Sequence, residues 1–399
     1  MKKSQVTIFA AFLALFAFRS ACFADTFTHR RTSELLHGYA TSRAEAGITA
    51  VHTREKGLID LNLADWRITP DRLGRNNKVI VLTLDNKIML QIQTEALIKA
   101  ITTASDQGPL FILLEIDTPG GRVDYTRRIC GAITQTANCH LAAFIKGGKY
   151  GGAMSAGAAV ALACDKIYMA DHTVIGAAAL MVLSGTGPKD FKTTYGQEVG
   201  EKFSSAWRAY LASLAEQNHR PGLLAGAMVD KDLEVIEVAD ADGTLFIDPI
   251  NKTPQQQLVH TWSKKGSLLT LTAEEAVKCQ IADKVLNSRR KLLRHLNAQD
   301  AEIVIDDSYQ QAQKQFDRAK RRFNRLTKSL DLKIKQMKRA KTTHRALKML
   351  SEIRKEYKAL LTLAKRYPDL QVNIPLLQQQ LNTAEALYKE AKMPRALSP

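Results

Sequence analysis

The stretch from Phe111 to Met181 constrains the fold of this chain more than any other part of its sequence. Residues 111–116 form an apolar run that predicts a strand buried on both faces, and a Thr-Pro-Gly-Gly turn follows it closely. An apolar segment over residues 127–136 then leads to a second apolar run over 141–145. This order predicts a β-α-β unit, with exposed backbone N–H groups in the glycine turn at the carboxyl end of the first strand.

Ser155 lies between a glycine-rich loop over residues 147–152 and an alanine-rich segment over 156–162 that predicts a helix. The N-terminus of a helix carries free N–H groups, and its dipole favours negative charge. We therefore expect a serine in this position to lie where an oxyanion can be stabilised.

The order and spacing of five short motifs resemble the ClpP/crotonase superfamily. The closest likeness is to its Ser-Lys peptidases, namely signal peptide peptidase A and the NfeD-type membrane-associated proteases. The likeness covers roughly residues 78–287, about half of the chain. The motifs are Thr118-Pro119-Gly120-Gly121, Ser155-Ala156-Gly157, Asp165 to Ala177, Leu269 to Ala276 and Ile281 to Val285.

The resemblance implies both a fold and a site. The fold would be an α/β core of the ClpP/crotonase type, a β-α superhelix. Ser155 would be the nucleophile, and the backbone N–H groups of Gly121 and Ala156 would form the oxyanion hole. Lys202 carries over as the base, because it directly precedes an amphipathic helix expected over residues 203–218. A lysine can accept the serine proton only when neutral, a state that burial favours.

Alternatives remain for the base and for the class of protein. Three further lysines are candidates for the base: Lys192, Lys189 and Lys149. A ClpP-like Ser-His-Asp triad would need one of three histidines: His172, in a turn, or the more distant His219 and His260. A crotonase-like enzyme acting on CoA esters would keep the oxyanion hole without needing Ser155. A catalytically inactive scaffold would keep only the fold.

The sequence contains no P-loop, no zinc-spaced Cys/His set and no dinucleotide fingerprint, so we expect neither a cofactor nor a metal. Two positions depart from the family pattern. Met154 precedes the serine where alanine is usual, and Cys279-Gln280 stands where the family usually has a glycine.

Residues 1–24 have the pattern of a secretory signal peptide, with two lysines, an apolar run over 6–18 and a cut after Ala24. An apolar run of about 13 residues is short for a membrane span. Residues 25–77 are polar and predict a loosely ordered arm with one short helix. Of the remaining cysteines, Cys130 and Cys139 are the one pair considered for a disulfide, against the simpler interpretation of four small buried residues.

Beyond residue 300 the chain becomes basic. Residues 308–367 carry about 19 Lys and Arg against about 4 acidic residues, which is roughly +15 of the formal net charge of +17. Apolar residues recur every seven positions, which predicts two helices folded back near 342–344, and a third helix is expected over 376–391. This tail could join subunits or lie on anionic lipid headgroups. Nucleic-acid binding fits the charge but not an exported protein.

Together these features predict four segments: a signal peptide (1–24), a polar arm (25–77), a ClpP/crotonase-like peptidase domain (78–290) and a basic, coiled-coil-like helical domain (300–392). The predicted function is a Ser-Lys peptidase that hydrolyses protein or membrane-protein substrates. We expect an exported homo-oligomer in the periplasm or another extracytoplasmic space, with peripheral membrane contact through the tail.

Overall fold

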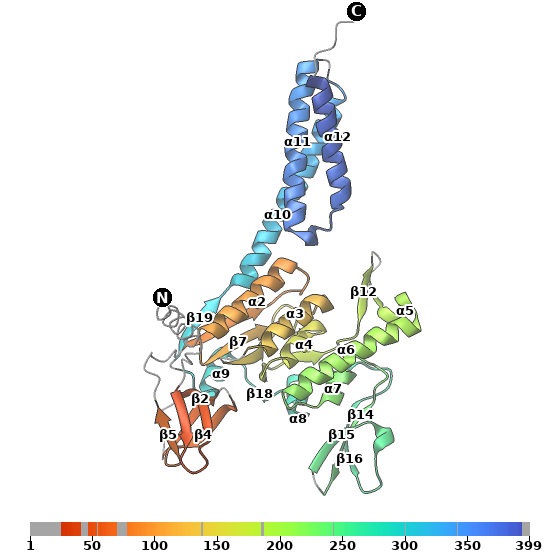
Figure 1. The fold of residues 1–399 in the computed structure, drawn as a ribbon. Coiled ribbons are helices and arrows are strands. Elements are labelled where there is room, and N and C mark those ends of the chain that lie inside the picture. The colour runs from red at the N-terminus through yellow and green to blue at the C-terminus, as the bar shows by residue number, and fades with distance from the viewer. Residues whose placement is uncertain are drawn as a thin grey trace, which may run out of the picture. The chain divides into compact units, whose positions relative to one another are not determined.

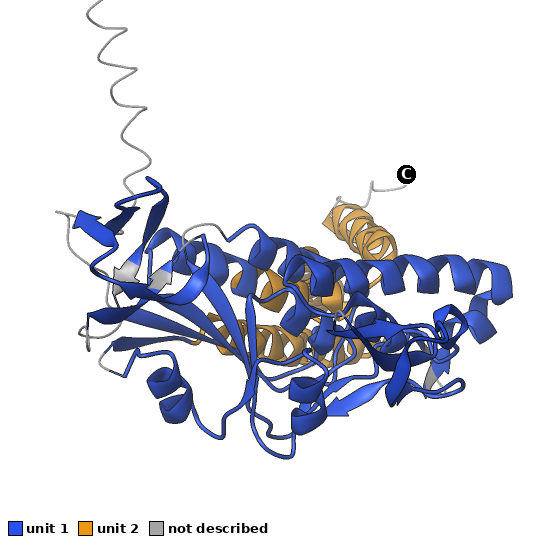
Figure 2. Cartoon of the chain, turned by 90° about the horizontal axis from the view of Figure 1, so that it is seen from below, with its two compact units in different colours: residues 1–88, 97–306 blue, residues 89–96, 307–399 orange. Residues whose placement is uncertain are grey.

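The computed structural model describes residues 25–40, 47–53, 55–69, 78–136, 139–184, 187–241, 243–299, 301–340 and 342–392. The chain divides into two compact units: unit 1 comprises Met1–Ile88 and Leu97–Asp306, and unit 2 comprises Met89–Ala96 and Asp307–Pro399 (Figure 2). The predicted signal peptide, residues 1–24, lies outside the described residues. Within the described ranges, no helix has the length and apolar character that a membrane span requires.

A six-stranded parallel sheet with the strand order β18-β10-β8-β7-β6-β19 forms the centre of unit 1 (Figure 1). Every residue of β7 is buried, which confirms the strand predicted from its continuous apolar run. The strands are β6 (Lys78–Leu84), β7 (Phe111–Ile116), β8 (His140–Ile145), β10 (Lys166–Met169), β18 (Lys284–Val285) and β19 (Glu302–Asp306). The helices that follow its central strands are α2 (Gln91–Asp106), α3 (Val123–Thr134) and α4 (Ala156–Leu162).

A smaller sheet beside α4 has the order β17-β11-β9, formed by β9 (Gly152–Met154), β11 (Val174–Gly176) and β17 (Thr270–Thr272). Before the next long helix, the chain forms a hairpin and a short helix. These elements are β12 (Met181–Ser184), β13 (Gly187–Asp190) and α5 (Phe191–Tyr195). The next helix, α6 (Gln197–Gln217), begins six residues before the expected start at 203. After it come α7 (Gly222–Ala227), α8 (Ala273–Lys278) and α9 (Arg289–His295).

The strands β14 and β15 pair antiparallel, with Asp240 opposite Gly243. This small sheet has the order β15-β14-β16. Its strands are β14 (Val235–Asp240), β15 (Gly243–Ile247) and β16 (Gln257–Ser263).

Residues 25–69 form a five-stranded antiparallel sheet rather than the expected loose arm with a short helix. The strands are β1 (Asp25–His29), β2 (Leu35–Ala40), β3 (Ile48–Thr53), β4 (Gly57–Asn62) and β5 (Trp66–Thr69), in the order β4-β3-β2-β1-β5. Each strand contributes only one or two apolar side chains to a shared core, so no single stretch looks apolar. The buried core residues are Phe27, Leu36, Val51, Leu61 and Trp66.

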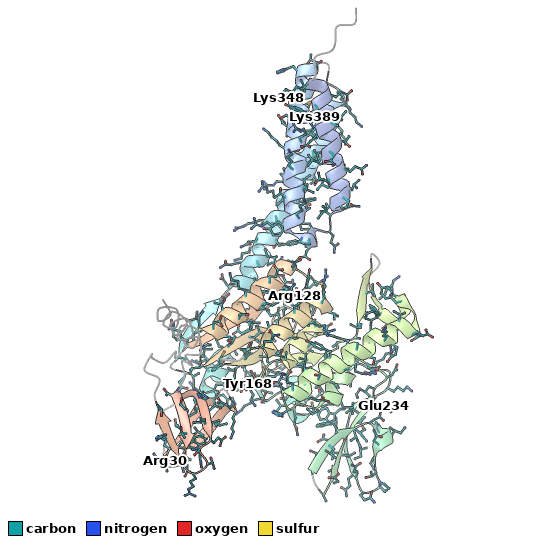
Figure 3. The ribbon with its side chains drawn as sticks, in the orientation of Figure 1. Arg30, Arg128, Tyr168, Glu234, Lys348 and Lys389 are labelled. Atoms are coloured by element: carbon teal, nitrogen blue, oxygen red, sulfur yellow. The ribbon has the colours of Figure 1, made fainter. Side chains whose placement is uncertain are left out.

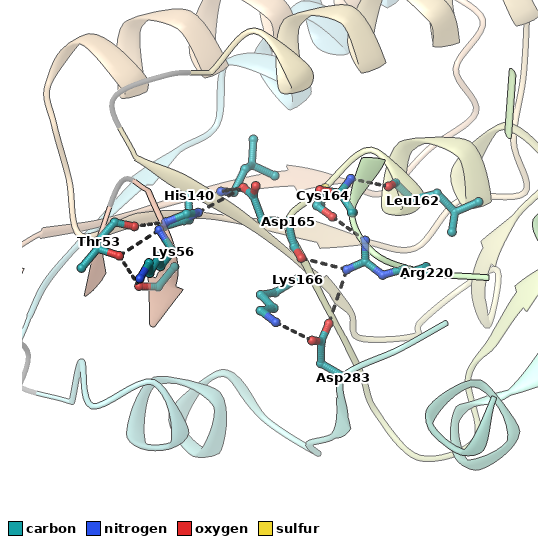
Figure 4. A network of polar contacts seen from close by, with 12 residues as sticks. Thr53, Lys56, His140, Leu162, Cys164, Asp165, Lys166, Arg220 and Asp283 are labelled. Atoms are coloured by element: carbon teal, nitrogen blue, oxygen red, sulfur yellow. Dashed lines mark hydrogen bonds and ion pairs between the residues drawn. The ribbon is translucent and has the colours of Figure 1, made fainter. Parts of the chain in front are cut away.

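His140, at the start of β8, connects this sheet to the six-stranded sheet (Figure 4). Its Nε2 atom contacts the carbonyl oxygen of Thr53, and its Nδ1 atom lies 3.7 Å from Oδ2 of Asp165. Asp165 in turn accepts a hydrogen bond of 2.7 Å from the backbone N–H of Leu141. Burial lowers the pKa of His140, but hydrogen bonding and attraction to Asp165 outweigh it and raise the pKa above 6.5.

All four cysteines of the described residues are free and buried, so the disulfide considered between Cys130 and Cys139 is wrong. Burial raises the pKa of both thiols to about 12, which makes them poor nucleophiles. The simpler interpretation, four small buried residues, is confirmed.

Unit 2 contains three long helices lying side by side: α10 (Ser308–Met337), α11 (Thr343–Arg366) and α12 (Ile374–Lys392) (Figure 1). The seven-residue apolar repeat predicted these helices, and its members Leu330 and Tyr357 are buried in their common core. Residues 302–306 were assigned to this helical segment from the sequence. They instead form β19, which pairs with β6 in unit 1.

Candidate active site

Asp117, at the carboxyl end of β7, holds the glycine-rich loop in place. Its buried carboxylate accepts hydrogen bonds from the backbone N–H groups of Tyr150 (3.1 Å) and Gly152 (3.2 Å). A Cβ atom on Gly148 would lie only 2.6 Å from Oδ2 of Asp117, so a residue without a side chain is required there. The loop is therefore fixed by one buried acid before the chain reaches the serine.

Thr118 brings the segment before Ser155 next to the Pro-Gly-Gly turn. Its N–H donates to the carbonyl oxygen of Gly152 (2.8 Å), and its own carbonyl oxygen accepts from the N–H of Met154 (3.0 Å). The turn passes so close that a Cβ atom on Gly120 would lie 2.6 Å from Cβ of Ser155 and 2.9 Å from N of Ala156. Glycine at position 120, with its φ of +97°, is what permits this approach.

Ser155 itself has an unusual backbone. It precedes α4 with φ 54° and ψ −120°, backbone angles that residues other than glycine rarely adopt. Its N–H donates to the carbonyl oxygen of Gly176 in β11 (2.8 Å), which fixes the turn. Such strained backbones occur preferentially at functional sites, and a sharp strand-to-helix turn projects a nucleophile in other hydrolases. The side chain of Ser155 is half-buried.

Gly121 follows Gly120 and Ala156 follows Ser155, so their N–H groups belong to the two segments that meet at the contact between Gly120 and Ser155. Ala156 is the first residue of α4, so its N–H has no partner within the helix. Gly121 pairs with Ile88 through its neighbours: Ile88 donates to the Gly120 carbonyl (3.0 Å) and accepts from the Arg122 N–H (2.8 Å). Among the described residues, neither the Gly121 nor the Ala156 N–H donates a hydrogen bond. Both remain candidates for the oxyanion hole.

A buried arginine secures the far end of α4 (Figure 4). The guanidinium of Arg220 donates to the carbonyl oxygens of Cys164 and Asp165, at 2.9 Å each, and lies 3.4 Å from Oδ2 of Asp283. The side-chain amide of Asn218 donates to the carbonyl of Leu162 (2.9 Å). These contacts satisfy carbonyl groups that the end of a helix leaves open, and they hold in place the helix that follows Ser155.

Among the described residues, no hydrogen bond joins Lys202 to Ser155. Lys202 is exposed on α6, on the face opposite the buried stripe that contains Ser204 and Trp207. That stripe anchors α6 beside the site, because Nε1 of Trp207 donates to the carbonyl oxygen of Ala178, two residues beyond β11 (3.0 Å).

The alternative bases also lack what a catalytic base needs, namely a neutral amine or imidazole in contact with Ser155. Nζ of Lys192 lies 2.6 Å from Glu201, and this hydrogen bond raises the pKa of Lys192, which favours its charged form. Nζ of Lys149 lies 5.1 Å from the centre of the Tyr150 ring. Lys189 and His172 are exposed, the latter in a turn with φ 61°. In the described part of the chain, no hydrogen bond joins any of these groups to Ser155.

Glu115 was not identified from the sequence, although a charged residue inside the apolar run of β7 is a signal. It is buried, and its carboxylate lies 2.6 Å from Nε of Arg289 and 2.9 Å from Nζ of Lys146. Burial raises the pKa of Glu115, but the hydrogen bonds from the two cations outweigh it, so the pKa is lowered. The pair of cations links β7, β8 and α9 below the site. No group of three or more His, Cys, Asp or Glu side chains in the described ranges is placed to hold a metal ion.

The fold and the site define an α/β protein built on a parallel sheet, with a serine at a strained turn next to a glycine turn. Residues 78–252 match the family model for the N-terminal domain of NfeD1b. The chain is 28% identical over 205 residues to membrane protein NfeD1b of Bacillus subtilis, covering 51% of this chain and 38% of that protein. It is 26% identical over 210 residues to membrane-bound protease PH1510 of Pyrococcus horikoshii, covering 52% of this chain and 37% of that protein.

Among solved structures, the chain is similar to the 1510-N membrane protease specific for a stomatin homolog from Pyrococcus horikoshii. The identity is 22%, with a TM-score of 0.36, over 58% of this chain and 91% of that one. The matched residues, 78–252, make up less than half of the chain. The chain thus spans well under half the length of the two curated relatives.

Proposed function

We propose that this protein is a serine peptidase in which Ser155 is the nucleophile. The observation that carries the proposal is the strained backbone of Ser155, held at φ 54° directly against Gly120. A strained backbone that neighbouring contacts hold in place costs free energy, which is typical of functional sites. Here it presents a hydroxyl beside two backbone N–H groups without partners among the described residues. Homology to a membrane-bound protease supports the same reaction class.

In the proposed reaction, Oγ of Ser155 attacks the carbonyl carbon of the scissile peptide bond while a base takes its proton. The carbonyl oxygen becomes an oxyanion that the N–H groups of Gly121 and Ala156 stabilise. The base then returns the proton to the leaving amine, and water hydrolyses the acyl-enzyme by the reverse sequence. Losing one oxyanion donor typically costs on the order of a hundredfold in rate.

We assign the base to Lys202, on the resemblance to NfeD-type proteases. This role requires Nζ of Lys202 to approach Oγ of Ser155 when substrate is bound, because the side chain is exposed in the present structure. A rearrangement of the first turns of α6 would achieve this. Lids and loops of many enzymes complete a catalytic site only on closure.

The proposed substrates are proteins or membrane proteins outside the cytoplasm. The signal-peptide pattern of residues 1–24 supports export, and both curated relatives are membrane proteins by name. We further propose that the protein works as a homo-oligomer joined through its helical tail.

A second candidate is an inactive scaffold that keeps the fold without turnover. The exposed position of Lys202 and the pairing of Lys192 with Glu201 favour it. The two candidates differ in whether Ser155 reacts.

The deciding experiment measures peptide hydrolysis and labelling by a fluorophosphonate, using the chain without residues 1–24. Ser155→Ala should abolish both. Lys202→Met and Lys202→Arg should each lower hydrolysis on the order of 10⁴-fold, and the double variant should lose no more, because nucleophile and base fail as a unit. Lys99→Met, at an exposed helix position away from the site, is the matched control and should behave like the wild type. Absence of hydrolysis and of labelling in the wild type would favour the scaffold.

A further inference from the structure

We propose that one face of α10 docks this protein on an anionic lipid surface. The face consists of Lys314, Arg318, Arg321, Arg325, Lys328, Leu332 and Lys335, here called the basic stripe. All seven residues are exposed. None of the six cations forms an ion pair with any residue that the structure describes.

The spacing places the stripe on one side of the helix. Successive members are four or three residues apart, so at 3.6 residues per turn they fall within an arc of about 100°. The buried apolar residues of α10 lie on the opposite side, among them Phe316 and Leu330. The packing of the bundle therefore holds the basic stripe toward solvent. At 1.5 Å per residue it extends for roughly 32 Å along a single rigid helix.

Three other cations of unit 2, Lys333, Arg354 and Lys358, form ion pairs within the bundle among the described residues. Lys333 lies 2.9 Å from Glu356 and 3.0 Å from Glu352, and Lys358 lies 2.8 Å from Glu385. Glu352, Glu356 and Glu385 thus pair with cations outside the basic stripe. The two acids of α10, Asp317 and Asp331, lie only at the edge of the stripe and leave its net charge strongly positive.

The composition of the stripe favours lipid headgroups over nucleic acid. A straight row of cations matches a flat, extended anionic surface, and each Lys or Arg near such a surface adds roughly fivefold to binding. The stripe contains no aromatic, Asn or Gln side chain that would stack on bases or read their edges. Its one apolar member, Leu332, is 57% exposed and is suited to the boundary between headgroups and acyl chains.

The test is co-sedimentation of the full chain without residues 1–24 with vesicles of phosphatidylcholine and 30% phosphatidylglycerol. The stripe variant replaces Arg318, Arg321, Arg325 and Lys328 with Gln. Four cations at about fivefold each predict a loss on the order of several hundredfold. Binding of the wild type should weaken steeply as salt rises and should vanish on vesicles of phosphatidylcholine alone.

The matched control removes the same four charges elsewhere in unit 2, by Gln substitution of Arg345, Lys348, Lys355 and Lys389. Figure 3 labels Lys348 on α11 and Lys389 on α12. Lys348 and Lys355 attract the carboxylate of Glu352 electrostatically, so their charges are partly balanced. Circular dichroism confirms folding of both variants. An equal loss of vesicle binding in the two variants would overturn the proposal that the basic stripe is the docking face, since net charge alone would then explain the binding. Tighter binding of duplex DNA than of vesicles, at equal phosphate concentration, would overturn lipid as the occupant.

Discussion

Replacing Gly120 with Ala tests the contact on which the proposed site depends. The added Cβ atom would lie 2.6 Å from Cβ of Ser155 and 3.0 Å from the carbonyl oxygen of Met154, at a backbone φ of +97°. A positive φ destabilises an alanine by about 1–2 kcal/mol. Overpacking against atoms that cannot move freely adds about 1–3 kcal/mol. We expect Gly120→Ala to lower the free energy of unfolding by about 2–5 kcal/mol.

Two matched variants separate these contributions. Gly151 has φ +77° but open space around its Cβ position, so Gly151→Ala reports the backbone strain alone, about 1 kcal/mol. Gly131 lies inside α3 with open space and no positive φ, so Gly131→Ala should stabilise the protein by about 0.5–1 kcal/mol. Urea denaturation of the three variants measures the series.

The same series reads out the geometry of the nucleophile. A shift of Ser155 by about 1 Å typically costs on the order of a hundredfold in rate. Gly120→Ala should therefore slow peptide hydrolysis and fluorophosphonate labelling by that factor, whereas Gly131→Ala should leave both unchanged. Wild-type stability together with wild-type labelling in Gly120→Ala would refute the close approach of the glycine turn to Ser155.

Three further perturbations test the surrounding structure. Glu115→Gln should lower the free energy of unfolding by about 1.5–3 kcal/mol at neutral pH, because two partly exposed cations lose the carboxylate that accepts their hydrogen bonds. Since the pKa of Glu115 is lowered in the folded state, its contribution is present above pH 4.5 and is lost as the pH falls below it, so urea midpoints of wild type and variant should converge in acid. The pKa of His140 is raised instead, so its contribution is fully present below pH 6.5 and is lost as the pH rises past the raised value. The midpoint difference between wild type and His140→Gln should therefore shrink with rising pH. A chain ending at Asp306 keeps β19 and should lose oligomeric mass in light scattering if the helices of unit 2 join subunits, while an unchanged mass would remove that role.

The parts of the fold that the sequence predicted are those with strong local periodicity. Residues 111–116 form a continuous apolar run because both faces of β7 are buried, and Phe316 and Leu330 recur at helical spacing because one face of α10 is buried. The sheet over residues 25–69 was missed because its core is assembled from one or two apolar residues per strand. Phe27 and Trp66 share a core because β1 pairs with β5, and these strands lie too far apart in the sequence for a local pattern to connect them.

The backbone of Ser155 illustrates a second limit. The glycine loop and the alanine-rich helix located the serine at a helix start, but its φ of 54° depends on contacts from two other segments, the turn after β7 and the strand β11. Asp117 fixes the loop, Gly176 accepts the serine N–H, and Gly120 leaves room beside the side chain. A similar case is Gln280, where the family usually has glycine: it adopts a φ of 63°, so the turn persists without the residue that favours it.

The base shows why helix phase matters more than motif spacing. An amphipathic helix starting at residue 203 would leave Lys202 in a loop, free to turn toward the serine. Because α6 starts at Gln197, Lys202 is a helical residue whose direction is set by the buried stripe of Gly200, Ser204 and Trp207. A residue two positions from each of Gly200 and Ser204 points about 160° away from them.

For Lys202 to act as the base, the first turn and a half of α6 must unwind or rotate. That movement would break the contact between the rings of Phe203 and Phe191, whose centroids lie 5.5 Å apart, and would move the buried Gly200. Nearby, Glu201 ties Lys192 to this same turn, so opening it would also release a second cation beside the site.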